Sequence, residues 1–250
     1  MNLSKRMETV VSMILPQSNV IADIGCDHAY VSIALVERKL ASKVIAMDVR
    51  KGPLEIAKRN IQNAGLHNVI DARLSDGMDA LQVAEADTII IAGMGGLLIT
   101  GILERGSAMF ADKEKAPVLI LQPQSELDKV RRYLYQHGYR ICEEKMLIED
   151  NKFYTVMRAQ PVGEDDKSEE PEEADYAYGR YNLEHQNPVL FEFLKKEQIL
   201  LSDISKQLLH QIEICREQEK KLPDKTKNRY KEIQKQIVIN EQGLMWYKEG

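Results

Sequence analysis

The chain has 250 residues, enough for one full domain and an appendage. Hydrophobic residues make up 44% and aromatic residues 6%, which indicates a globular protein with an aliphatic core, and no apolar run approaches the roughly 18 residues that span a bilayer. Three scattered cysteines, Cys26, Cys142 and Cys215, predict free thiols in a reducing cytoplasm. Neither they nor the five histidines have the spacing of a metal site, so we expect no metal and no membrane contact.

The net charge of −5 is concentrated in one segment of the chain. Residues 161–175 carry eight acidic residues and one lysine, whereas the residues before them are balanced and those after them slightly basic. An acidic stretch bounded by prolines predicts a solvated linker or loop, which we place at 161–187. Its charge does not argue against a polyanionic partner for the rest of the chain.

The first 160 residues alternate short apolar runs with amphipathic ones. The alternation predicts an α/β fold with a Rossmann-like, mostly parallel sheet covered by helices on both faces. Two further strand-like runs follow without a helix between them, which predicts a closing hairpin and an antiparallel last strand. The seven expected strands lie at 19–25, 43–49, 68–76, 86–93, 117–123, 139–150 and 152–160.

The character of the sequence changes near residue 188. The segments 188–216 and 224–248 contain almost no glycine, and Pro223 separates them. In both, apolar residues recur at steps of three and four, with Asn240 as a polar position in the second seam. Two such helices joined by a short turn predict an antiparallel two-helix coiled coil. The expected divisions are a domain at 1–160, the acidic linker at 161–187 and the helical arm at 188–250.

The stretch "DIGCDHAY", residues 23–30, follows the first strand, where a doubly wound sheet binds its ligand. Asp48 ends the second strand roughly 20 residues later, where a carboxylate can hold both hydroxyls of a ribose. A simpler interpretation remains open, in which Gly25 only permits a tight turn and Asp27 only caps the next helix. Together the two acidic strand ends favour a nucleoside ligand.

Electrostatics distinguishes the possible nucleoside cofactors. A dinucleotide would place its pyrophosphate on this turn, beside the negative charge of Asp27. S-adenosylmethionine has an ammonium and a sulfonium instead, so a carboxylate in the turn attracts it. Asp76 and Gly77 follow the third strand and could bind adenine, although a simple Asp-Gly turn explains them equally well. The glycines of "AGMGG", residues 92–96, indicate close approach of backbone to a ligand or a sharp turn.

These stretches together resemble the bacterial tRNA (adenine-22-N1)-methyltransferase family. The resemblance covers essentially the whole chain and implies a class I methyltransferase domain with a C-terminal helical arm. It also implies S-adenosylmethionine as the cofactor and N1 of adenosine 22, in the D-loop of tRNA, as the methyl acceptor. The stretches that carry it are "LSKRM" (3–7), "ADIGCDHAYVSIAL" (22–35), "AMDVRKGPLEIAKRNI" (46–61), "LSDGMDAL" (74–81), "IIIAGMGG" (89–96) and "LILQPQSE" (119–126).

The resemblance implies roles for individual residues. The first turn would surround the methionine part of the cofactor, Asp48 would bind the ribose and Asp76 the adenine, and "AGMGG" would lie under the reacting centre. Cys26 occupies a small-residue position and is not expected to be a nucleophile. The expected cofactor-binding residues are Asp23, Gly25, Cys26, Asp27, His28, Asp48, Asp76, Gly77, Ala92, Gly93, Met94 and Gly95. The expected catalytic residues are Asp27, His28 and Tyr30.

Basic residues gather at the turn of the predicted arm, and tRNA phosphates attract such clusters. A solvated helix connection that simply collects lysines is the competing interpretation. Arg6 could reach the cofactor carboxylate or a tRNA phosphate, or be an ordinary surface arginine. The expected RNA-binding residues are Arg6, Lys221, Lys225, Lys227 and Arg229.

Three other functions stay open at this point. The chain could methylate another RNA, a protein or a small molecule, or it could bind the cofactor without catalysis and use its coiled coil for a partner. An NAD-dependent oxidoreductase is disfavoured by Asp27. The oligomeric state is not determined by the sequence, with a monomer slightly favoured.

Overall fold

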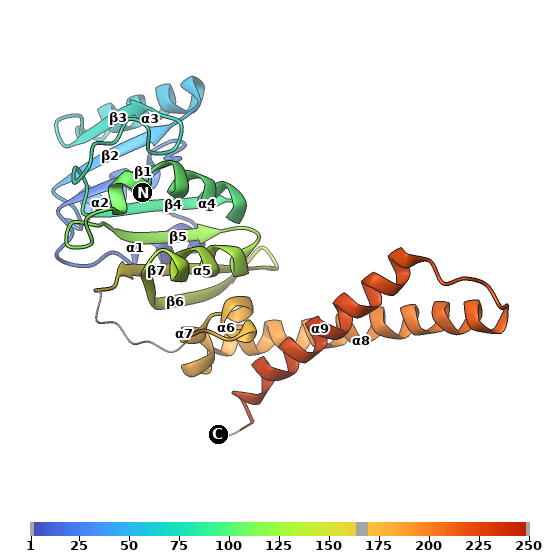
Figure 1. Ribbon diagram of the computed structural model, residues 1–250. Helices are drawn as coiled ribbons and strands as arrows, with labels where there is room; N and C mark the ends of the chain where they lie inside the picture. Colours follow the sequence, from blue (N-terminus) through green and yellow to red (C-terminus); the bar gives the residue numbers. More distant parts are fainter. Residues whose placement is uncertain (1–2, 164–169, 249–250) are drawn as a thin grey trace. The chain divides into compact units, whose positions relative to one another are not determined.

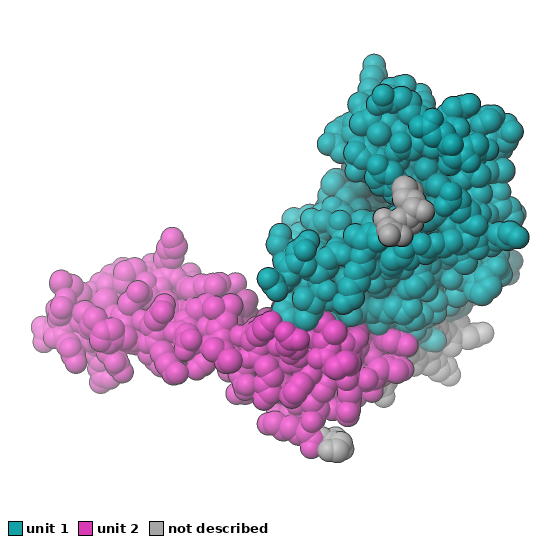
Figure 2. All heavy atoms as spheres, turned by 180° about the vertical axis from the view of Figure 1, so that it is seen from behind, with its two compact units in different colours: residues 1–169 teal, residues 170–250 magenta. Residues whose placement is uncertain are grey.

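The computed structural model describes residues 3–163 and 170–248. The chain divides into two compact units, residues 1–169 and 170–250 (Figure 1, Figure 2). We describe each unit by itself. Residues 164–169, which fall within the expected acidic linker at 161–187, lie outside the described residues.

Unit 1 is built on a seven-stranded sheet in the order β3-β2-β1-β4-β5-β7-β6. Strands β1 to β5 pair in parallel, and β7 pairs antiparallel with both β5 and β6, so the predicted fold class is confirmed. The strands are β1 Val20–Ile24, β2 Lys43–Asp48, β3 Ile70–Leu74, β4 Thr88–Met94, β5 Val118–Pro123, β6 Tyr139–Glu149 and β7 Lys152–Pro161.

The last strand of the chain, β7, is antiparallel as expected, but it does not form the edge of the sheet. Strand β7 lies between β5 and β6, and β6 forms the edge. The reason is burial: the run Thr155, Val156 and Met157 in β7 is buried throughout, which requires cover on both faces of the sheet. Strand β6 is only intermittently buried and includes charged residues, as suits an edge.

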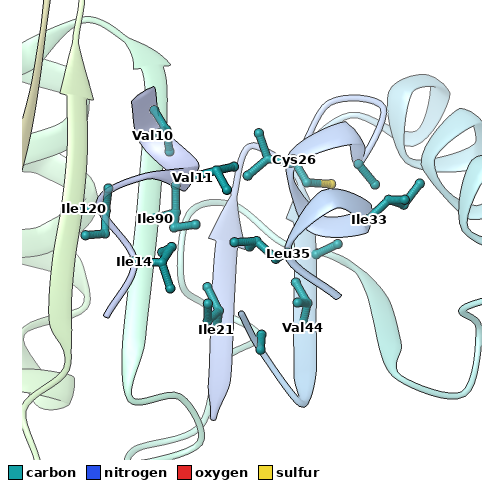
Figure 3. Close-up of a cluster of buried hydrophobic side chains, with 14 of the residues drawn as sticks. Val10, Val11, Ile14, Ile21, Cys26, Ile33, Leu35, Val44, Ile90 and Ile120 are labelled. Carbon is teal, nitrogen blue, oxygen red and sulfur yellow. The ribbon is translucent and has the colours of Figure 1, made fainter. Parts of the chain in front are cut away.

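Helices cover both faces of the sheet. Helices α1 (Lys5–Val11), α2 (Tyr30–Glu37) and α3 (Lys51–Asn63) contribute to one core cluster, part of which is drawn in Figure 3. Helices α4 (Gly96–Arg105) and α5 (Leu127–Gln136) contribute to the other, and a short 3-10 helix, η1 (Ser107–Phe110), follows α4. Isoleucines of β4 alternate between the two clusters, because successive side chains of a strand point to opposite faces. The helices leave the carboxyl ends of β1, β2 and β4 for the site described below.

Unit 2 contains α6 (Glu173–Tyr178), α7 (Arg180–Glu184), α8 (Pro188–Glu217) and α9 (Asp224–Met245). The first two helices fall inside the range expected to be a linker. Two signals explain them: Glu172 and Asp175 form a reciprocal capping box, and the apolar side chains Tyr176, Tyr178 and Leu183 are buried. The charge of the segment hid these signals in the sequence.

The two long helices of unit 2, α8 and α9, pack along one another as the seams predict. Asn240 is buried in this seam, and its Nδ2 donates to the carbonyl oxygen of Leu194 at 3.1 Å and to Glu197 at 2.9 Å. The burial is confined to one end of the pair, since no described residue between 206 and 230 is buried. None of the helices that the structure describes has the length and apolar character needed to cross a bilayer.

Candidate cofactor site at the carboxyl ends of the strands

The turn after β1 is folded tightly against the neighbouring strand ends. The backbone N–H groups of Gly25 and Cys26 both donate to the carbonyl oxygen of Met47, each at 2.8 Å. Gly25 has φ +76°, and a Cβ at this position would lie 2.2 Å from Cε of Met94. The backbone conformation therefore favours glycine, and a side chain here would also have to displace the terminal methyl group of Met94.

Asp27 does not cap the helix that follows. Helix α2 begins at Tyr30, and its N-cap residue, Ala29, makes no side-chain capping bond. Asp27 itself has φ +50°, a left-handed conformation that is uncommon outside glycine. Its carboxylate is 59% exposed and lies 3.7 Å from both Nε2 of His28 and a guanidinium nitrogen of Arg50. Exposed pairs at such distances hold a side chain weakly, so Asp27 is available to a ligand.

Two further carboxylates at these strand ends are buried. Asp23 accepts a 2.6 Å hydrogen bond from the Ser32 hydroxyl, and Asp48 accepts from the backbone N–H of Asp27 at 3.2 Å and of Arg50 at 2.8 Å. Burial raises the pKa of Asp23 to about 6, and the negative charge of Asp48 adds to the rise, whereas the Ser32 hydrogen bonds oppose it. The site thus concentrates negative charge in partly desolvated surroundings, which favours a cationic ligand.

A cavity of about 500 Å³ opens beside the turn, within the usual size range of small-molecule sites. Its charged lining is acidic: Asp23 and Asp27 face it, and none of the described residues around it is Lys or Arg. The ring of His28 meets that of Tyr30 edge to face, with centroids 5.8 Å apart. The lining residues are Leu3, Ser4, Met7, Asp23, Gly25, Cys26, Asp27, His28, Tyr30, Val31 and Ala92.

Seven of the residues expected from the sequence therefore surround one cavity. Four lining residues were not foreseen: Val31, and three from the segment that begins α1. The short stretch "LSKRM" belonged to the resemblance, but nothing in its composition distinguishes Leu3, Ser4 and Met7 from an ordinary amphipathic helix start. Only the tertiary structure brings them to the first turn.

The other expected cofactor residues lie outside the cavity lining. Asp48 adjoins it through the N–H of Asp27. Asp76 is 66% exposed and pairs with Arg105 at 3.0 Å, and Gly77 has φ +59°. Ser75 ties this turn to β2, because its N–H donates to the carbonyl oxygen of Asp48 at 3.0 Å. The ends of β2 and β3 are thus held together.

The segment from Ala92 to Gly95 ends β4 and leads into α4. Gly93 has φ +78°, Met94 contacts the position where Gly25 lacks a side chain, and Gly95 is the N-cap of α4. Burial and the nearby carboxylates raise the pKa of the Cys26 thiol, which agrees with its expected lack of nucleophilic character. Among the described residues, no cluster of His, Cys, Asp and Glu could hold a metal ion.

Arg6 is neither on the open surface nor in the cavity lining. One of its guanidinium nitrogens donates to Oε1 of Gln122 at 3.1 Å, and the guanidinium lies 5.3 Å from the ring centroid of Tyr154. Gln122 is fully buried and its amide was not singled out from the sequence. A polar residue at the end of an otherwise apolar strand, "LILQ", was the available signal.

In unit 2, the basic residues lie on and after the connection between α8 and α9. We call Lys221, Lys225, Lys227 and Arg229 the basic tip. Lys221 is in the connection, and the other three are in the first two turns of α9. All four are exposed, and Arg229 pairs with Glu232 at 2.8 Å.

A family model described as a methyltransferase domain matches residues 3–157, which contain the turn, the cavity and all seven strands except the end of β7. The chain belongs to this methyltransferase family. Over 160 residues, or 64% of its length, it is 42% identical to the tRNA (adenine(22)-N(1))-methyltransferase of Bacillus subtilis (strain 168), and the match spans 66% of that enzyme.

Solved structures extend the similarity of this methyltransferase to the whole chain. The crystal structure of the B. subtilis m1A22 tRNA methyltransferase TrmK matches with a TM-score of 0.81 and 31% identity, over 97% of this chain and 99% of that one. TrmK of M. capricolum, in complex with S-adenosyl-homocysteine, matches with a TM-score of 0.78 and 26% identity over 98% of each chain. The predicted resemblance to the bacterial tRNA (adenine-22-N1)-methyltransferase family is thus confirmed.

Proposed function

We propose that the protein transfers a methyl group from S-adenosylmethionine to N1 of adenosine 22 in bacterial tRNA. The observation that carries the proposal is the cavity beside the first turn, whose charged lining is entirely acidic in a chain of this methyltransferase family. The activity printed for the B. subtilis relative supports the choice of substrate. The free thiols of the three cysteines agree with action in the cytoplasm, where tRNA is modified.

The residues present fit this cofactor better than a dinucleotide. Asp23 and Asp27 would face its ammonium, and Asp48 would bind the ribose hydroxyls. Asp76, exposed at the end of β3, would accept from the adenine amino group. A pyrophosphate would instead meet two carboxylates with no lining cation to offset them. When bound, S-adenosylmethionine supplies an electrophilic methyl group on its sulfonium.

The chain's contribution to the reaction is mainly positioning. N1 of adenine has a lone pair near neutral pH and can attack a methyl group directly, so alignment and exclusion of water supply most of the rate enhancement. N1 lies on the pairing edge, so the base must leave its stack to reach the cavity. Tyr30, 44% exposed at the cavity, is placed to stack on it. The methylated base is cationic until it loses an amino proton, and the exposed carboxylate of Asp27 stabilises that charge or takes the proton.

The basic tip is proposed to bind tRNA phosphates. Cations in the first turns of a helix oppose its macrodipole, whose positive end is at the N-terminus, so Lys225 and Lys227 do not stabilise α9. Solvation alone does not explain why basic residues collect there. A polyanionic partner does, because each phosphate contact releases a counterion and strengthens binding.

Incubation of the full chain with methyl-labelled cofactor and bulk bacterial tRNA tests the proposal. We expect label in 1-methyladenosine, mapped to position 22 by a primer-extension stop. A tRNA transcript with guanosine at position 22 is the matched control and should accept no label. Label in another nucleoside, or binding of the cofactor without any transfer to tRNA, would refute the proposed function.

A further inference from the structure

Strand β4 changes its alternation at Gly93. Ile90 and Ala92 pack with the core cluster on the α1 side, and Ile89 and Ile91 pack with the other. Continued alternation would return the residue at position 94 to the α1 side, yet Met94 packs with the opposite cluster. The pairing with β5 shifts at the same point, so Gly93 is the extra residue of a bulge. Beyond Ala92, β4 therefore has no side chain of its own on the α1 side.

The bulge is held by a buried side chain instead of a ladder bond. The N–H of Gly93 donates to Oε1 of Gln122 at 3.1 Å, and Arg6 donates to the same oxygen at 3.1 Å. Nε2 of Gln122 donates to the carbonyl oxygen of Pro123 at 3.1 Å, so both ends of this fully buried amide are engaged. Arg6 is held in turn over the ring of Tyr154. These contacts join α1, β4, β5 and β7 at one point.

The position of these contacts in the sheet indicates which part of the site they affect. The carboxylates proposed to hold the cofactor, Asp27, Asp48 and Asp76, lie at the ends of β1, β2 and β3, which leaves the ends of β4 and β5 for the approach of a second substrate. Ala92, directly before the bulge, lines the cavity, whereas Gln122 and Arg6 do not. Their contacts can therefore fix the geometry on the acceptor side without touching the cofactor.

We propose that Gln122 and Arg6 are positioning residues for the methyl-acceptor base, which act by fixing the Gly93 bulge. The inference rests on the proposed function, since it assumes a base that enters beside Ala92. Arginine is suited to the position because a flat guanidinium can donate to Gln122 while it stacks over Tyr154. A residue whose contacts are exposed and only structural would not hold the bulge in place, so its substitution would not change turnover.

Gln122→Met tests the proposal, because methionine keeps the length of the side chain and removes the acceptor. We expect kcat for tRNA to fall by about 10²-fold, the scale of a small misplacement of reacting groups, with the cofactor Kd within about threefold of wild type. The Gly93 amide, followed by NMR, should exchange its proton faster. Arg6→Lys should show a smaller loss of the same kind, and Gln122→Glu, which restores the acceptor oxygen, should recover part of the loss.

Arg38→Gln is the matched control. Arg38 forms a two-pronged exposed pair with Glu8 that also attaches α1 to the rest of unit 1, but it does not touch the bulge. It should leave kcat and Gly93 exchange unchanged. An unchanged kcat in Gln122→Met, or a parallel loss of cofactor affinity and kcat, would overturn the proposal. If Gln122→Met does not fold, kcat for tRNA and the cofactor Kd are measured in Arg6→Lys and Gln122→Glu instead. A fall in kcat without a matching loss of cofactor affinity supports the proposal, and any other result overturns it.

Failure of the two proposals can be told apart. Unchanged Gly93 exchange in Gln122→Met refutes the role of the amide whatever the substrate is. A wild-type chain that binds the cofactor but transfers no label to tRNA adenosine refutes the proposed function, and leaves the exchange result standing.

Discussion

We expect Asp23 to link both the stability of the protein and cofactor binding to pH. Burial raises its pKa from the ordinary 3.8 to about 6. Because the pKa is higher in the folded than in the unfolded chain, folding takes up a proton in this range. The resulting stabilisation is fully present below about pH 4 and is lost as the pH rises through 6. About two pKa units at 1.36 kcal/mol each make the ionised group cost the free protein about 3 kcal/mol at pH 8.

Asp23→Asn removes the titration and keeps the size of the side chain. We expect the free energy of unfolding of wild type, minus that of Asp23→Asn, to rise by about 2.5 kcal/mol between pH 8 and pH 4, measured by urea denaturation at several pH values. Taking this difference cancels the contributions of all other titrating groups to first order. A difference that does not change with pH would refute the assignment.

The same group should make cofactor binding release a proton at low pH. A bound ammonium stabilises the ionised form of Asp23, so affinity should fall by up to about tenfold per pH unit below 6 in wild type but not in Asp23→Asn. Calorimetry at pH 5.5 in two buffers of different ionisation enthalpy counts the released protons. A His28→Gln background excludes the neighbouring imidazole as their source. Equal affinity ratios of the two proteins at pH 5 and pH 8 would contradict the role of Asp23.

Three further predictions concern Asp48, Asp27 and the basic tip. Asp48→Asn should weaken cofactor binding by about 1.5–3 kcal/mol per lost bond, measured by calorimetry. Asp48→Ala should also destabilise the fold by leaving two partly buried N–H groups without their carboxylate acceptor. Unchanged affinity in both variants would remove Asp48 from the site. Asp27→Asn should lower turnover strongly and the melting temperature little, because its ion pairs are long and exposed; wild-type rates would rule out a catalytic role. Replacing the basic tip by four glutamates should abolish tRNA methylation with cofactor affinity intact, and normal methylation would assign the arm another purpose. The control carries glutamate at four exposed lysines elsewhere in unit 2, Lys195, Lys196, Lys206 and Lys235.

The sequence predicted the elements of unit 1 well because their signals are local. Short apolar runs between amphipathic ones placed β1 to β5 to within about two residues, the usual uncertainty of boundaries. The order of β6 and β7 in the sheet could not be predicted from local signals. It depends on which strand must be covered on both faces, and the burial of Thr155 to Met157 is seen only in the packed structure. Likewise, the acidic charge of 161–175 concealed two short helices whose buried tyrosines lie just beyond it.

The residues of the candidate site also fall into those that local sequence signals predict and those that depend on tertiary contacts. Asp23, Gly25 and Asp27 were predictable because they share one turn at a strand end. Ser4 and Met7 were not, since they reach the cavity only through contacts of α1 across the sheet. Gln122 was overlooked because its importance depends on a bulge in another strand, and no periodicity in its own strand indicates that partner.

Those contacts of α1 have a consequence for the order of folding. Lys5 donates to the carbonyl oxygen of Ile148 at 3.2 Å, and the N–H of Arg6 donates to Glu149 at 3.2 Å, so each bond joins residues 143 positions apart. Contacts of such long range form slowly, because the chain between them must first be ordered.

During synthesis, the first helix leaves the ribosome early but must wait for the hairpin of β6 and β7 before it can dock. The turn after β1 can form sooner, with one wall of its cavity still missing. Cofactor binding by nascent chains of increasing length should therefore begin only once β7, which ends at Pro161, has emerged, and its onset marks the completion of the sheet.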